Sequence, residues 1–181
     1  MDYKITAFDL KLALLQYCRF ERQWVCVEEF RGADVFVDTD KDIIEIEVKV
    51  NKGDLENKEI HKVLKHQRYR VGRSHRLCHP NRFYFCVPEF LVKSAHQVCE
   101  SLNPKYGIIA FNPDVFERHI KWGWRGPHKR CLRMARGANR LHENYSSSRK
   151  DIAMRASAKT ISLMEQIFRR NYQDIERIKN D

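Results

Sequence analysis

The sequence lacks long apolar runs and a recognisable targeting segment. No stretch approaches the roughly 20 apolar residues that a membrane-spanning helix needs, and the opening MDYKITAFDL does not have the layout of a signal peptide. No internal repeat or low-complexity tract interrupts the chain. Its 181 residues are enough to bury a core as one domain. We therefore expect a soluble, cytoplasmic protein with no membrane partner.

The cysteines lack the spacing of a zinc site. None of the six lies in a CxxC pair. His75, Cys78 and His79 are close in sequence, but no second pair completes a tetrahedral site, so a polar loop is the favoured interpretation. We expect the cysteines to be reduced and largely buried thiols.

Acidic residues are missing from residues 118–142, where eight basic residues lie. The whole chain has 34 Lys and Arg against 24 Asp and Glu, a net charge of +10. Such an excess predicts attraction to polyanions, of which nucleic acid is the commonest, although solubility alone also explains a basic protein. The clustering favours a polyanion partner.

Hydrophobic periodicity predicts the element order α-β-β-β-α-β-α-β in the first 111 residues. Short polar breaks between the first three strands are typical of hairpin turns. Asp54 is expected to cap the second helix and Pro88 to open the third. The predicted helices span about 6–20, 54–70 and 88–102, and the predicted strands span 24–30, 33–38, 43–50, 82–87 and 107–111.

The remaining residues, 112–181, are predicted to form a basic helical extension packed on the core of residues 1–111. A helix over about 127–143 would align four basic side chains along one side, which we interpret as a polyanion-binding stripe, with a solvated face as the alternative. These residues are Lys129, Arg133, Arg136 and Arg140.

Two further features belong to this extension. A last long helix follows SSSRK, where Ser148 and Asp151 fit a capping box. Trp122 and Trp124 are candidates for stacking on bases, although packing at a junction is the commoner role of such residues.

The stretch EIEVKV, residues 45–50, places Glu45, Glu47 and Lys49 on one face of a predicted strand. An antiparallel hairpin would bring Asp34 beside Glu47. Two converging carboxylates repel unless a cation lies between them, and Mg²⁺ accepts such oxygens while leaving sites for water and phosphate. Lys49 would then stabilise charge developing on phosphorus. The pattern predicts metal-dependent phosphodiester hydrolysis, with ion pairs on a solvated sheet face as the alternative.

The ordered segments resemble the PD-(D/E)XK nuclease superfamily, and more closely its MmcB-like branch of DNA repair nucleases. The resemblance covers about residues 5–111 and is carried by GADVFVD, IIEIEVKVNKGDL, KHQRY, NRFYFCVPEFL and YGIIAF. It implies an α/β fold with a restriction-endonuclease-like αβββαβ core, in which helices flank a mixed central sheet, followed here by the helical C-terminal extension.

The resemblance also implies residue roles. Asp34 and Glu47, with the carbonyl of Val48, would hold Mg²⁺, for which Mn²⁺ can substitute, and Lys49 would be the catalytic lysine. The superfamily often has a further acid before the aspartate. Glu29 is favoured for that position.

Two other acids stay open for the same role, Glu28 and Asp9. Ala33 stands where the superfamily has the proline that gives it its name. We expect this replacement to be tolerated because proline is not a metal ligand.

Basic residues crowd one side of the predicted second helix. We interpret them as phosphate contacts, an interpretation that the resemblance supports for Lys65 and His66, with a solvated helix face as the alternative. His66 is also a candidate proton donor to the leaving oxygen. The set comprises Lys58, Lys62, Lys65, His66 and Arg70.

Taken together, the sequence predicts a Mg²⁺-dependent deoxyribonuclease acting in DNA repair, recombination or phage DNA processing. DNA would be its partner, and a homodimer is one possible assembly. A nucleic-acid-binding module on the same fold that does not cleave is the first alternative. A small-molecule or protein-interaction domain, basic only for solubility, is the second.

Overall fold

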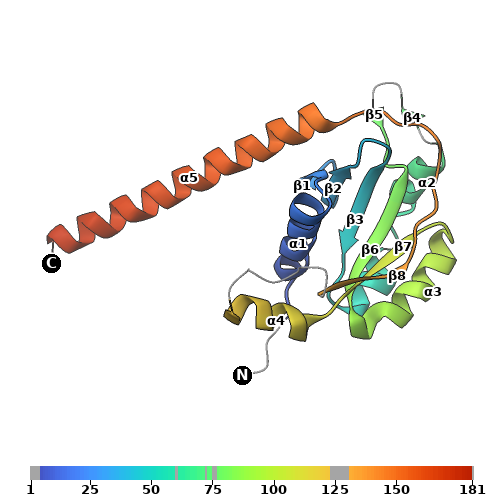
Figure 1. Cartoon of the computed structure of the whole chain (residues 1–181), viewed down its shortest axis with the longest axis horizontal. Helices are drawn as coiled ribbons and strands as arrows, with labels where there is room; N and C mark the ends of the chain where they lie inside the picture. Colours follow the sequence, from blue (N-terminus) through green and yellow to red (C-terminus); the bar gives the residue numbers. More distant parts are fainter. Residues whose placement is uncertain (1–4, 60, 72, 75–76, 123–130, 181) are drawn as a thin grey trace.

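A mixed six-stranded sheet forms the centre of the structure, a computed structural model that describes residues 5–59, 61–71, 73–74, 77–122 and 131–180 (Figure 1). The spatial order is β1-β2-β3-β6-β7-β8. β1, β2 and β3 form an antiparallel meander, β3, β6 and β7 run parallel, and β8 is antiparallel to β7. The strands are β1 (Val25–Phe30), β2 (Ala33–Asp38), β3 (Ile43–Val48), β6 (Arg82–Pro88), β7 (Gly107–Phe111) and β8 (Leu132–Arg136).

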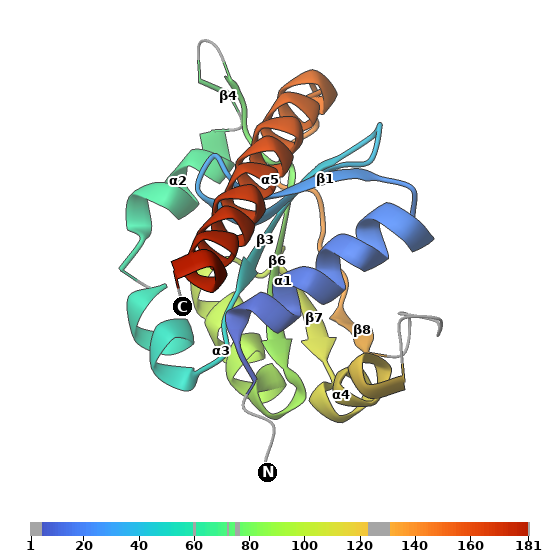
Figure 2. The ribbon, with the colours of Figure 1, turned by 90° about the vertical axis from the view of Figure 1, so that its left-hand side faces the viewer.

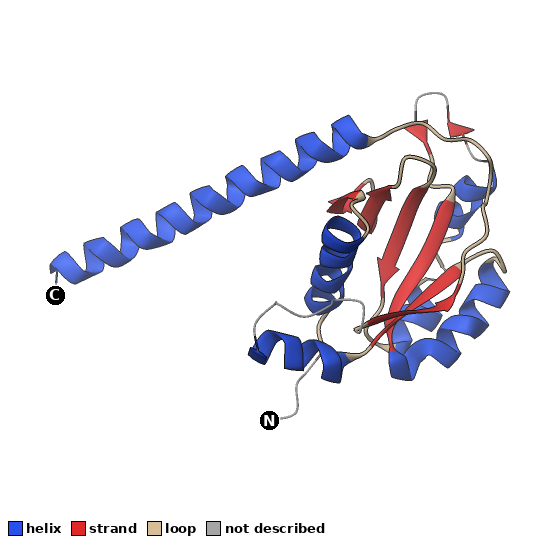
Figure 3. Ribbon diagram, viewed as in Figure 1, coloured by secondary structure: helices blue, strands red, loops and turns tan. Residues whose placement is uncertain are grey.

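Helices cover both faces of this sheet, so the chain belongs to the α/β class (Figures 2 and 3). A separate two-stranded hairpin consists of β4 (Arg73–Ser74) and β5 (Leu77–Cys78). The α-helices are α1 (Ala7–Gln16), α2 (Val63–Val71), α3 (Val92–Leu102), α4 (Pro113–Trp122) and α5 (Arg149–Asn180), and shorter turns are the π-helices η1 (Tyr17–Glu21) and η2 (Asp54–Lys58) and the 3₁₀-helix η3 (Glu89–Leu91).

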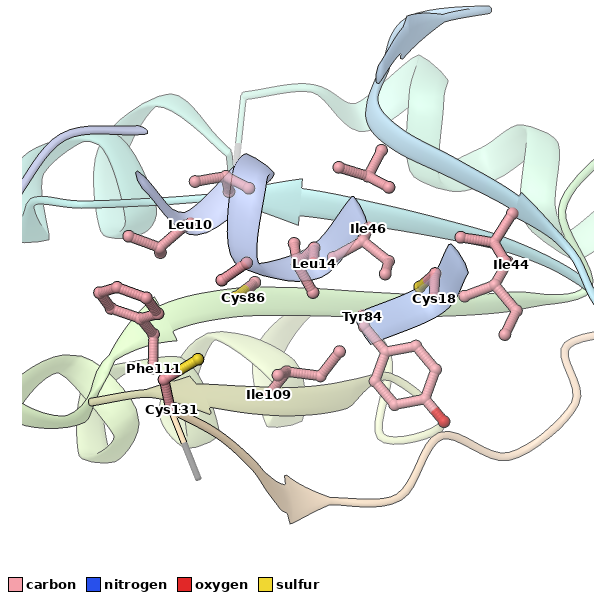
Figure 4. Close-up of a cluster of buried hydrophobic side chains, with 14 of the residues drawn as sticks. Leu10, Leu14, Cys18, Ile44, Ile46, Tyr84, Cys86, Ile109, Phe111 and Cys131 are labelled. Carbon is pink, nitrogen blue, oxygen red and sulfur yellow. The ribbon is translucent and has the colours of Figure 1, made fainter. Parts of the chain in front are cut away.

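One face of the sheet packs against α1 and α4. Ile44 and Ile46 of β3 meet Leu10 and Leu14 of α1 in an apolar cluster (Figure 4). Burying side chains of this size contributes about 1.5–3 kcal/mol each. Because strand side chains alternate, this packing directs the intervening β3 residues to the opposite face.

The opposite face packs against η2, α2 and α3. Phe83 and Phe85 of β6 are fully buried there, together with Val98 of α3. In the parallel register Glu45 lies beside Phe83 and Glu47 lies beside Phe85. The fold therefore carries two carboxylates into an otherwise apolar layer.

The first hairpin turn matches its sequence. Phe30 pairs with Ala33, which leaves Arg31 and Gly32 as a two-residue turn with φ of 54° and 84°. Two successive positive φ values define the tight turn whose twist suits an antiparallel pair. This turn fixes the β1–β2 register.

The second helix is broken where the sequence predicts a continuous one over 54–70. Its first part, η2, has Gly53 rather than Asp54 at its N-cap position, and α2 starts only at Val63. Between them the amide of Lys62 donates to the carbonyl of Glu59 at 3.0 Å. Glu59, at the C-cap position of η2, is fully buried.

The predicted helix over 127–143 is wrong where the structure describes it. Residues 132–136 form β8, which pairs along the free edge of β7, with a register shift at Ile108 and Ile109. Backbone hydrogen bonding to an open sheet edge prevails here over the helical spacing of the arginines. Lys129 lies outside the described residues, and Arg133, Arg136 and Arg140 do not form a helical stripe, because the first two lie on β8 and the third follows it.

The chain after β8 is fixed to the end of the sheet by two carboxylates, the partly buried Asp42 and the buried Asp38. Asp42 accepts from Arg82 and from Arg140, each at 2.8 Å. Asp38 is fully buried and accepts from the amide of Ser148 at 2.8 Å and from the hydroxyl of Tyr145 at 3.0 Å. The segment that leads into α5 is thereby held on the core.

α5 contacts the sheet only through its beginning. Ile152 is buried beside Phe36, and Lys159 pairs with Glu28 of β1 at 2.9 Å. Farther along, the helix extends away from the sheet with Ile161 and Met164 exposed (Figure 1). Within the described part of the chain, no helix has the length and apolarity that a bilayer crossing requires.

Gly107 provides a test of packing at the start of β7. A Cβ at this position would lie 2.4 Å or less from two ring carbons of Tyr84 and 2.8 Å from the amide nitrogen of Ala138, whereas a Cβ at Gly137 would meet nothing within 4 Å. We expect Gly107→Ala to lower the free energy of unfolding by about 1–3 kcal/mol. Denaturant unfolding checks this, with Gly137→Ala as the control. Equal effects of the two substitutions would contradict the packing described.

Candidate active site

The candidate site is built around Glu45 and Glu47 of β3. Both side chains are nearly inaccessible, each residue being 3% exposed. Lys49 follows directly after the strand, and its amide donates to the carbonyl of Cys86 at 3.0 Å, which continues the β3–β6 pairing. Two buried carboxylates in an apolar layer require compensating charge.

Asp34 joins this site from β2. Its Oδ2 accepts from the amide of Val48 at 2.8 Å, so the carboxylate lies against the backbone between Glu47 and Lys49. Its Oδ1 lies 3.3 Å from the Nζ of Lys11. The hairpin therefore brings Asp34 to the backbone segment that carries the other two predicted catalytic residues.

Three ammonium groups surround Glu47. Lys49 and Lys62 lie 3.3 Å and 3.5 Å from its Oε2, and Lys65 pairs with its Oε1. Lys65 also lies 2.6 Å from Oε1 of Glu45. The carboxylate of Glu47 thus pairs with lysines from two places, the end of β3 and the α2 segment.

The charges of Glu45 and Lys65 depend on each other. Burial raises the pKa of Glu45, and Lys65 only partly offsets that effect. Burial opposes the charge of Lys65 as well, but Glu45 and Glu47 more than compensate and raise the pKa of Lys65 above its ordinary value. Tyr69 lies beside Glu45, and burial together with that carboxylate raises the pKa of its phenol.

Glu59 is a member of the site that the sequence patterns did not single out. It is fully buried, with Oε2 lying 2.9 Å from Lys49 and 3.0 Å from Lys62. Burial opposes its ionisation, but His66, Lys49 and Lys62 hold the pKa of Glu59 well below its ordinary value. A signal was present, because Glu59 is the single acid among residues 57–70.

His66 supports Glu59 from the far side. Its Nε2 lies 3.3 Å from Oε1 of Glu59, and its Nδ1 shares a 2.8 Å hydrogen bond with the hydroxyl of Tyr106. The imidazole is 7% exposed and packs beside Phe83. The buried imidazole of His66 therefore does not lie on an exposed helix face, where a phosphate contact would be expected.

The candidates for an additional acid lie in different environments. Glu29 has a positive φ of 50°, and its carboxylate, 59% exposed, pairs with Lys11 at 3.2 Å. Lys11 is also the partner of Asp34, so one ammonium joins these two acids, and it lowers the pKa of Glu29. Glu28 pairs with Lys159, and Asp9 caps α1 by accepting from Thr6.

The basic residues assigned to nucleic-acid binding are mostly paired with acids. Lys62 and Lys65 contact the site carboxylates, and Arg70 lies on α2 with its side chain outside the described part. Arg133 pairs with Glu89, Arg136 with Glu100 at 2.6 Å, and Arg140 with Asp42 and Glu143.

The tryptophan pair and the His75–His79 loop of the sequence analysis lie partly outside the described residues. Trp124 and His75 lie outside the described residues, as do the side chains of Trp122 and Cys78. The five cysteines with described side chains are free thiols, and Cys18, Cys86, Cys99 and Cys131 among them are buried.

The donor chemistry fits a hard divalent cation. Asp34 and Glu47 supply carboxylate oxygens from adjacent strands, and each pairs with its own ammonium group, Lys11 for Asp34 and Lys49 among those of Glu47. Among the described residues, no three or more His, Cys, Asp or Glu side chains form a group that could hold a metal ion. A cation here would therefore depend on backbone oxygen and water besides the two carboxylates.

Comparisons with known proteins give no match to a family model, a curated protein or a solved structure.

The buried charge of Glu59 predicts a pH-dependent stability. Glu59→Gln removes one of the two buried carboxylates that pair with Lys49 and leaves Glu47 as the other, which we expect to cost about 3–5 kcal/mol at pH 7 in EDTA. Because folding lowers the pKa of Glu59, its contribution is present above the unfolded value of about 4.3 and is lost as the pH falls through the lower folded value.

Urea unfolding at several pH values measures this effect. The difference between wild type and Glu59→Gln should shrink as the pH falls below about 4.3. Glu56→Gln, which removes the half-exposed partner of Lys52, is the matched control and should change stability little. A Glu59→Gln deficit that persists unchanged into acid would contradict the assignment of a buried, ionised Glu59.

Proposed function

We propose that this protein is a metal-dependent DNA nuclease that hydrolyses phosphodiester bonds. In this proposal the meander, the broken second helix and the parallel strands form a restriction-endonuclease-like αβββαβ core, and α5 is a C-terminal extension. DNA repair, recombination and phage DNA processing are the settings that suit such an activity.

The observation that carries the proposal is that the carboxylate of Asp34 lies against the backbone of Val48, the residue between Glu47 and Lys49. Asp34 accepts from the amide of Val48, and Lys49 pairs with Glu47 at 3.3 Å. Burying the carboxylate of Glu47 costs several kcal/mol unless nearby positive groups compensate its charge. Buried charges of this kind concentrate at functional sites.

Asp34, Glu47 and the carbonyl of Val48 would hold Mg²⁺. When bound, the ion would polarise a phosphate oxygen and lower the pKa of a bound water. The residues of the chain supply the remaining electrostatics. Glu59 and Glu47 outweigh the effect of burial and raise the pKa of Lys49, so its side chain is an ammonium.

An ammonium has no free electron pair, so Lys49 cannot act as the base in this state. Its contribution is to stabilise negative charge as it grows on the phosphoryl oxygens, an interaction stronger in the transition state than in the bound substrate. Lys62, 40% exposed at the rim, is placed to exchange its carboxylate partner for a phosphate of DNA.

One observation favours a second candidate function, a nucleic-acid-binding module that does not cleave. Glu47 already pairs with Lys49, Lys62 and Lys65, so its charge is compensated without a metal. In that case the cluster would be a structural network. Metal binding and cleavage distinguish the two candidates.

Incubation with labelled double-stranded, single-stranded and branched DNA in Mg²⁺, Mn²⁺ or EDTA tests the proposal. We expect metal-dependent cleavage of at least one substrate. Asp34→Asn, Glu47→Gln and Lys49→Ala should each slow it by about 100-fold or more, the loss typical of removing an electrostatic catalytic group.

Lys49→Ala should leave DNA affinity nearly unchanged, because its interaction develops in the transition state. Glu56→Gln, on the exposed side of η2, should cleave at the wild-type rate. Metal-dependent cleavage that survives all three site substitutions would place the active centre elsewhere. Binding without cleavage of any substrate would favour the non-cleaving module.

A further inference from the structure

Lys49 has two carboxylate partners, and they differ in one important respect. Glu47, 3.3 Å away, is also a proposed metal ligand, whereas Glu59, 2.9 Å away, comes from a different element, the end of η2. A divalent ion would compete with Lys49 for the charge of Glu47. Glu59 is the partner whose attraction for Lys49 does not depend on that competition.

A lysine side chain needs such a partner to keep a fixed position. Its flexible stem carries about 2 kcal/mol of rotamer entropy, and a point charge displaced by about 1 Å loses much of its catalytic effect. Glu59 is itself restrained, because the η2–α2 turn holds its backbone and its carboxylate is fully buried.

His66 and Tyr106 complete the restraint. Nε2 of His66 lies 3.3 Å from Glu59, and its Nδ1 shares the 2.8 Å hydrogen bond with Tyr106, which is fully buried beneath the sheet. A continuous series of polar contacts therefore runs from Tyr106 through His66 and Glu59 to Lys49. Its first members lie in the same layer as Phe83 and Phe85.

We infer that Glu59 is a positioning residue, held in place by His66, that keeps the ammonium of Lys49 at the reaction centre. The inference rests on the proposed nuclease function. It assigns a role in catalysis to the segment between η2 and α2, because Glu59 directly follows η2.

A double-mutant cycle between Glu59 and Lys49 tests the inference in single-turnover cleavage. Glu59→Gln should lower the rate constant by roughly 10- to 100-fold, the loss typical of removing a partner that orients a site residue. In the Lys49→Ala background the same substitution should cause no further loss, because Glu59 acts through Lys49. DNA affinity in EDTA should be unchanged in all variants.

Two further variants separate positioning from general stability. Glu59→Asp keeps the charge but withdraws it by one methylene, so it should lose less rate than Glu59→Gln, and it replaces Glu59→Gln in the cycle if that variant does not fold. Glu56→Gln should behave as wild type. A loss of rate that is equally large with and without Lys49 would overturn the inference, because Glu59 would then act independently of Lys49.

The contact can also be measured without cleavage. In ¹⁵N-labelled protein without metal, the Nζ signal of Lys49, assigned by its loss in Lys49→Ala, should shift or broaden in Glu59→Gln but not in Glu56→Gln. An unchanged signal would overturn the inference. If wild type cleaves no DNA, the proposed function fails while this signal still tests the contact; if wild type and Glu59→Gln cleave equally, only the inference fails.

Discussion

The burial of two carboxylates on one face of β3 is the constraint on which the surrounding structure depends. Glu45 and Glu47 lie in a layer formed by Phe83, Phe85 and the helices above them. An unpaired carboxylate there would cost several kcal/mol. Ammonium groups from the end of β3 and from the α2 segment compensate this charge. Two of these lysines, Lys49 and Lys62, also pair with the buried Glu59. The result is a network of alternating charge rather than a single ion pair.

This network includes both halves of the second helix. Glu59 faces the sheet and meets Lys49, while Leu55 of η2 and Tyr69 of α2 pack into the same apolar layer. Leu55 and Glu59 are four residues apart, so both lie on the same side of their segment. On β2, the carboxylate of Asp34 accepts a hydrogen bond from the amide of Val48. Both backbone hydrogen bonds and ion pairs therefore hold the charged side chains of the site in place.

Alternation along residues 43–50 and the turn at Arg31 and Gly32 predicted the meander, because each depends on local backbone geometry. Glu59 was missed because its importance depends on Lys49, a residue of another element, although its spacing of four residues from the buried Leu55 places both on one side of a helix. The strand at residues 132–136 was missed because its arginines also fit a helical spacing. What decides there is the open edge of β7, a nonlocal partner that periodicity does not encode.

The central claim is that the carboxylates of Asp34 and Glu47 bind one divalent cation between them. Anomalous diffraction from crystals grown with Mn²⁺ tests it most directly, because it locates the ion independently of any substrate. The account predicts one strong peak within coordination distance, about 2.0–2.6 Å, of oxygens from both Asp34 and Glu47, with at least one ammonium moved away from Glu47. A peak elsewhere, or none at millimolar Mn²⁺ while the lysines keep their ion pairs, would contradict it.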